Sequence, residues 1–123
     1  DFEAAEEHII NQFGILHYKV EQIRAAGLTH CVQEAIDRLQ DADIIFVSFD
    51  VDSLDCDQIS YGTGTPVKSG FQPEEVSAIL ELVFDTRKVV CLEVVEINPL
   101  LDNKGNKMAE TAFEVLDKVS NTI

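Results

Sequence analysis

The stretch IIFVSFDVD at residues 44–52 is the most informative part of the sequence for the fold. It is a continuous apolar run, rich in β-branched and aromatic residues, and it ends in two aspartates. Such runs are typical of strands buried on both faces, as in parallel sheets. A second run of this kind, VVCLEVV, occupies residues 89–95. The two runs predict two strands of a parallel sheet, in which Cys91 is expected to be a small core residue.

Around these runs, apolar residues recur with helical spacing. The pattern predicts helices over residues 3–13 and 20–26, a helix capped by Thr29 and a helix with Pro73 in its first turn. A last helix is expected to carry on one face Ala109, Ala112, Phe113 and Leu116. Residues 15–18 are expected to form a short strand. Alternating helices and strands predict a single α/β domain with a parallel sheet.

The charge of the chain is strongly one-sided. Its 123 residues include 23 acidic and 9 basic side chains, for a formal net charge of −14. This argues against nucleic acid and anionic membranes as partners, because both require a basic surface. No run approaches the roughly 18 apolar residues that a membrane-spanning helix needs. The three cysteines have neither disulfide nor zinc spacing, so a reducing cytoplasm is the expected location.

Asp50 and Asp52 follow the first apolar run, and ligands of α/β sheets bind beyond the carboxyl ends of strands. In an extended segment, residues i and i+2 point to the same side, so the two carboxylates are expected to converge. A divalent cation would relieve their repulsion, and hard oxygen ligands suit Mg²⁺ or Mn²⁺. Helix caps and solvated loop acids share this spacing, so both interpretations stay open on these residues alone.

Two other cation-linked motifs compete for the same residues. An EF-hand loop would need a ligand at Leu54, whose side chain cannot coordinate a cation. A haloacid-dehalogenase-type phosphatase also has a D-x-D pattern after a hydrophobic strand, which residues 44–52 resemble. Ser53 and Leu54 depart from the usual continuation of that motif, but the phosphatase remains an alternative.

Three segments together resemble the ureohydrolase family of arginase, agmatinase and formimidoylglutamase. They are SFDVDSLD at 48–55, GTGTP at 62–66, which is most similar to arginase, and EVVEINP at 93–99. The resemblance covers nearly the whole chain. It implies a three-layer α/β/α sandwich around a parallel sheet, with residues 1–123 as the C-terminal part of a single domain of that kind.

The resemblance also implies a site. Asp50 and Asp52 match aspartates that bind manganese, typically two Mn²⁺ ions, which lower the pKa of a shared water. Glu96 matches a catalytic glutamate that contacts the guanidinium of the substrate, and Thr65 matches a threonine of the substrate pocket. Glu7 resembles a glutamate that recognises the α-amino group of arginine. These matches imply a small-molecule guanidino substrate, hydrolysis of arginine to urea and ornithine, and a homo-oligomer.

One family feature is absent from this sequence. The family takes further metal ligands from an earlier histidine and a D-x-H-x-D segment, and His8, His17 and His30 lack such spacing. We therefore expect the isolated chain to be inactive and to bind Mn²⁺ weakly. Agmatine, formimidoylglutamate and a module without catalysis remain alternatives.

Overall fold

The computed structural model describes residues 4–121. Both predicted strands are confirmed, and so are the predicted helices apart from their exact ends. Residues 15–18 are not a strand, and Thr29 is not a cap, because the helix begins one residue earlier, after Gly27. The elements are α1 (Ala4–Phe13), α2 (Val20–Ala26), α3 (Leu28–Arg38), β1 (Ile45–Asp50), the 3₁₀ turn η1 (Val51–Ser53), α4 (Pro73–Phe84), β2 (Val89–Val95) and α5 (Lys107–Ser120).

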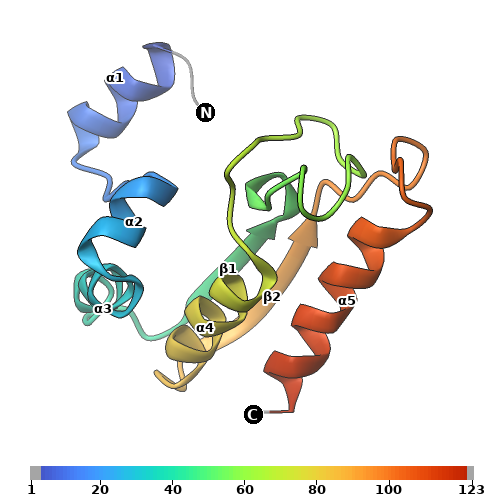
Figure 1. Cartoon of the computed structure of the whole chain (residues 1–123). Helices are drawn as coiled ribbons and strands as arrows, with labels where there is room; N and C mark the ends of the chain where they lie inside the picture. The colour runs from blue at the N-terminus through green and yellow to red at the C-terminus, as the bar shows by residue number, and fades with distance from the viewer. Residues whose placement is uncertain (1–3, 122–123) are drawn as a thin grey trace.

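The two strands form a parallel sheet, as the sequence predicts. The pairing runs from Phe46 opposite Cys91 to Asp50 opposite Val95. Parallel neighbours need a crossover connection, and α4 provides it. Both strands therefore end at the same edge of the sheet, and Figure 1 shows α4 in front of the strands and α5 beside β2. The class is α/β.

The face of the sheet under α4 and α5 carries the core. Phe49 of β1 packs there with Val51 and Leu54, which follow the strand, and with buried residues of both helices. Leu54 is 1% exposed and Val115 of α5 is 2% exposed. Burying an apolar side chain of this size stabilises the fold by about 1.5–3 kcal/mol before entropy is counted.

The opposite face of the sheet is open in the part of the chain that the structure describes. Phe46 is 60% exposed, and Cys91 and Glu93 are also exposed. The expectations of strands buried on both faces and of a core Cys91 are therefore wrong for these residues. No described helix packs over them. Glu93 has a structural role, because its carboxylate accepts a hydrogen bond of 2.8 Å from the Ser48 hydroxyl on the neighbouring strand.

The buried face of α5 is rotated from the predicted one. Its buried stripe includes Met108, Ala112, Val115 and Val119, whereas Phe113 is 67% exposed. Phe113 instead lines an apolar groove of about 420 Å³ along β2. In the described sheet the outer edge of β2 has no paired strand, so it offers unpaired backbone N–H and C=O groups.

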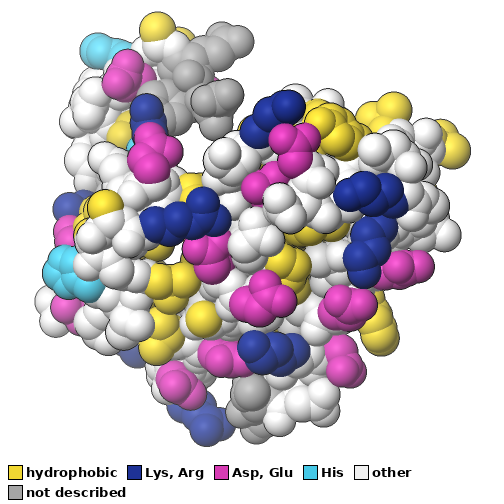
Figure 2. Space-filling model, in the orientation of Figure 1, with side chains coloured by type: hydrophobic (Ala, Val, Ile, Leu, Met, Phe, Trp, Pro, Cys, Tyr) yellow, Lys and Arg dark blue, Asp and Glu magenta, His cyan; other side chains and the backbone are white. Residues whose placement is uncertain are grey.

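The surface reflects the acidic composition. Figure 2 shows acidic side chains spread over one face, with fewer basic ones between them. Hydrophobic side chains gather near the loop after β2, where the exposed residues are Ile97, Leu100 and Leu101. Among residues 4–121, no helix combines the length and the apolar character needed to span a membrane.

Candidate functional site at the carboxyl ends of the strands

Asp50 and Asp52 are held by a turn and not by strand alternation. β1 ends at Asp50, and the chain then enters η1. The Asp50 carboxylate caps this turn by accepting a 2.8 Å hydrogen bond from the backbone N–H of Asp52. Ser53 closes the turn by donating its hydroxyl to the Asp50 carbonyl oxygen at 2.6 Å. The argument from an extended backbone is therefore wrong, although Asp50 is the last residue of the strand and Asp52 follows it closely in η1.

The Asp52 carboxylate has two different environments. Its Oδ2 accepts a hydrogen bond from the Thr65 hydroxyl. Its Oδ1 is buried and has no hydrogen-bond partner among the described residues. A buried carboxylate oxygen without a partner is costly, and a cation would satisfy it. No ion pair between described residues includes Asp50, Asp52 or Glu96, so their negative charges are not compensated within this region. This oxygen donor set fits a hard divalent cation, and Mn²⁺ is one such ion.

Glu96 follows the last residue of β2 and lies at the same edge of the sheet. Its backbone φ is 66°, a left-handed conformation that is strained for residues other than glycine. A Cβ built on Gly64 would lie 3.6 Å from Glu96 Oε2, so this carboxylate lies against the GTGTP segment. Thr65, the next residue, contacts Asp52. The segment thus brings together Asp52, Thr65 and Glu96.

The loop that carries Thr65 is fixed by pairing with the segment after η1. Phe71 N–H donates to the Ser53 carbonyl at 2.8 Å, and Asp55 N–H donates to the Phe71 carbonyl at 3.0 Å. Cys56 N–H donates to the Val67 carbonyl at 2.9 Å. Gly70 is required by this contact, since a Cβ there would lie 2.5 Å from the Ser53 carbonyl oxygen. These hydrogen bonds therefore join the segment that follows Asp52 to the loop that carries Thr65.

Asp102 holds the other side of the loop in place, and no local pattern in the sequence identifies it. Its carboxylate accepts hydrogen bonds from the Ser60 hydroxyl and the Met108 N–H, both at 2.9 Å, and from the Lys104 N–H at 2.8 Å. Burial alone would raise the pKa of Asp102, but the N–H groups of Met108 and Lys104 outweigh it and lower the pKa. Asp102 thus holds the start of α5 against the GTGTP segment.

Other predicted or titratable residues lie apart from this site. Glu7 is exposed on α1, which Figure 1 shows away from the carboxyl ends of the strands. The structure does not bring Glu7 to Glu96. His8, His17 and His30 are exposed. Across residues 4–121, no group of three or more His, Cys, Asp or Glu could hold a metal ion, so the aspartate pair is at most part of a metal site.

The sequence matches the arginase family over residues 1–120. The chain belongs to the arginase family. The arginase of Bacillus subtilis (strain 168) is 33% identical to this arginase-family chain over 114 residues, which are 93% of the chain and 38% of that protein. The arginase of Plasmodium falciparum is 28% identical over 99% of the chain and 30% of that protein. The chain therefore spans about a third of the length of these curated relatives.

Solved structures confirm the arginase-like fold. The crystal structure of arginase from Bacillus subtilis superposes with a TM-score of 0.88 at 32% identity, covering 97% of this chain and 42% of that one. Formimidoylglutamase from the same species reaches a TM-score of 0.89 at 24% identity, which shows the fold alone. Membership of the arginase family overturns the haloacid-dehalogenase alternative, since the family covers nearly the whole chain.

Proposed function

We propose that this chain is the C-terminal part of a manganese-dependent hydrolase that cleaves the guanidino group of arginine to urea and ornithine. The observation that carries the proposal is the Asp52 carboxylate, with one oxygen held by Thr65 and the other buried without a partner. The similarity to arginases supports arginine over agmatine or formimidoylglutamate as the substrate. The complete gene product would work in the cytoplasm as a homo-oligomer.

Each residue has a distinct role in this proposal. Asp50 and Asp52 bind Mn²⁺, and two bound Mn²⁺ ions would supply a water of lowered pKa as the nucleophile. Glu96 binds the planar guanidinium through charge-assisted hydrogen bonds. Thr65 lines the substrate pocket, and its hydroxyl also orients the Asp52 carboxylate. Glu7 recognises the α-amino group of the substrate, a role that requires the complete gene product to bring α1 to the site.

The isolated chain is expected to lack activity and to bind Mn²⁺ weakly. Affinity depends on the number of ligands and on a preformed geometry, and the aspartate pair provides too few ligands for two ions. Calorimetric titration with Mn²⁺ and a urea-release assay on the 123-residue chain test this expectation. Micromolar binding of two ions per chain, or turnover, would contradict it.

A substrate panel on the complete gene product tests the proposal as a whole. We expect Mn²⁺-dependent urea release from arginine in preference to agmatine and formimidoylglutamate. Asp52→Asn should lower kcat/KM by at least about a hundredfold, because even partners of metal ligands contribute about 10–100-fold. Asp41→Asn makes the same change of carboxylate to amide at an exposed position away from the site, so it is the matched control and should keep activity. Preference for another amidine would overturn the substrate, and inactivity on all three would favour a module without catalysis.

A further inference from the structure

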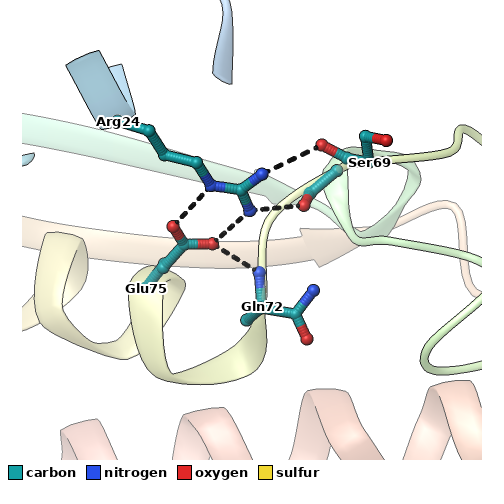
Figure 3. Close-up of polar contacts among 5 residues, drawn as sticks. Arg24, Ser69, Gln72 and Glu75 are labelled. Carbon is teal, nitrogen blue, oxygen red and sulfur yellow. Dashed lines mark hydrogen bonds and ion pairs between the residues drawn. The ribbon is translucent and has the colours of Figure 1, made fainter. Parts of the chain in front are cut away.

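One arginine side chain connects α2 to a loop end and a helix that follow 45 to 51 residues later in the sequence. Arg24 of α2 binds Glu75 of α4 through two parallel bonds, Nε to Oε1 at 2.9 Å and Nη2 to Oε2 at 2.7 Å (Figure 3). The same guanidinium donates to the carbonyl oxygen of Gly70 at 2.8 Å and to that of Ser69 at 3.4 Å. We call these four residues the Arg24 clamp.

Glu75 also caps the helix to which it belongs. Its Oε2 accepts a 2.8 Å hydrogen bond from the backbone N–H of Gln72, the residue before α4. The hydrogen bond from Arg24 lowers the pKa of Glu75 below its ordinary value. The Glu75 carboxylate thus accepts hydrogen bonds from both the start of its own helix and Arg24. It therefore fixes the position at which the loop joins α4.

The backbone connects the clamp to the candidate site. Gly70 packs against the backbone of residues 53–55, where a Cβ would have no room. Phe71, the next residue, exchanges hydrogen bonds with Ser53 and Asp55. If Gly70 moves, either these hydrogen bonds break or the segment that follows Asp52 moves with it. The same loop carries Thr65, which donates to Asp52.

The geometry is unlike that of an ordinary surface ion pair. Exposed pairs contribute little because solvent screens them, and Lys118–Glu81, between α5 and α4, is such a pair with one contact of 3.4 Å. Arg24 instead makes four bonds, two of them to backbone carbonyl oxygens. A lysine cannot reproduce this planar, forked arrangement.

We propose that Arg24 is a positioning residue, which holds the end of the loop at Ser69 and Gly70 so that Thr65 stays on the Asp52 carboxylate. The catalytic part of this inference rests on the proposed function. The structural part does not, because it concerns hydrogen bonds within this chain.

Amide hydrogen exchange in the complete gene product tests the structural part. In Arg24→Ala we expect the Phe71 and Cys56 amides to exchange about tenfold faster, as the loss of hydrogen bonds to a charged group implies. Amides of β2 should be unchanged. Arg24→Lys, which keeps the charge, should show a smaller increase in these exchange rates. It replaces Arg24→Ala as the test variant if Arg24→Ala does not fold. Lys118→Ala is the matched control and should show none. Exchange within twofold of wild type in both Arg24 variants overturns the inference.

Mn²⁺ affinity and kinetics test the connection to the site. Arg24→Ala should weaken Mn²⁺ binding and lower kcat/KM by about tenfold to a hundredfold, since a misplaced group far from the chemistry can have effects of that size. Arg24→Lys should restore the melting temperature more fully than Mn²⁺ affinity. Faster exchange with unchanged Mn²⁺ affinity would show that the clamp does not act on the site. If the wild type hydrolyses no amidine, the proposed function fails, while exchange and Mn²⁺ affinity still decide the inference.

Discussion

The two faces of the sheet carry similar sequences in very different surroundings. On the face covered by α4 and α5, Phe49 of β1 is only 5% exposed. On the open face, Phe46 is 60% exposed and Cys91 is exposed as well. Both faces come from the same apolar runs, so hydrophobicity alone does not distinguish them. The difference teaches that the described chain covers one face of its sheet with its own helices, while the other face has no cover within residues 4–121.

The largest expected effect comes from truncating one residue on each side of this comparison. Leu54→Ala should lower the free energy of unfolding by about 2–5 kcal/mol, because it leaves a cavity in the packed core. Phe46→Ala should change it by less than about 0.5 kcal/mol, since its ring already lies largely in water. Urea unfolding of the 123-residue chain at low protein concentration measures both values. Equal losses would mean that the open face is covered in solution.

The second prediction compares two glycines of one loop. Gly70→Ala should destabilise the chain by about 1–3 kcal/mol, because its Cβ would overlap backbone atoms of Ser53, Leu54 and Asp55. Gly64→Ala introduces the same methyl group where the nearest atom, Glu96 Oε2, is at an ordinary distance of 3.6 Å. Thermal unfolding of the two variants side by side tests the difference. A tolerated Gly70→Ala would show that the ladder near the site is looser than the structure indicates.

The third prediction concerns Asp102, which joins the loop to the start of α5 beside the packed core. Asp102→Ala removes the acceptor for Ser60, Lys104 and Met108 and should lower the free energy of unfolding by about 1–3 kcal/mol. Asp41→Ala, at an exposed position, is the control and should have little effect. Chemical denaturation monitored by circular dichroism measures both. A neutral Asp102→Ala would show that solvent replaces the lost bonds.

The smallest effect concerns pH. Because Arg24 lowers the pKa of Glu75 in the folded chain, Glu75 stabilises the fold above its ordinary pKa of 4.5, and this contribution is lost as the pH falls through the lower folded value. Glu75 is partly exposed, so the effect should stay below about 1 kcal/mol. Glu75→Gln should therefore reduce the loss of stability on acidification below pH 4.5. An unchanged profile would show that this pair contributes nothing measurable.

Local patterns in the sequence predicted the two strands and α4. The runs at residues 44–49 and 89–95 became β1 and β2 within one residue, and Pro73 does begin α4. The pattern could not show the open face, since hydrophobicity tells which residues favour burial and not which segment covers them. Arg24 also escaped prediction, because Glu75 lies 51 residues away and no local spacing relates the two.

The turn after Asp50 marks a different limit of sequence reasoning. A two-residue spacing predicts convergence only in an extended backbone, and the Asp50 side chain itself ends that conformation by capping η1. The roles of Asp50, Asp52, Thr65, Glu96 and Glu7 stay predictions until the substrate panel and the Mn²⁺ titrations are done.

The left-handed backbone of Glu96 has an evolutionary consequence. A non-glycine residue in this conformation loses about 1–3 kcal/mol, and glycine at the same position would recover much of that. Selection for heat resistance alone would then favour glycine at codon 96, whereas under the proposed function selection for amidine turnover would retain glutamate. A library randomised at this one codon should therefore yield different residues when it is sorted by heat resistance and when it is sorted by turnover. The difference in stability between the two sets of variants would measure how much stability the lineage has given up to keep this carboxylate.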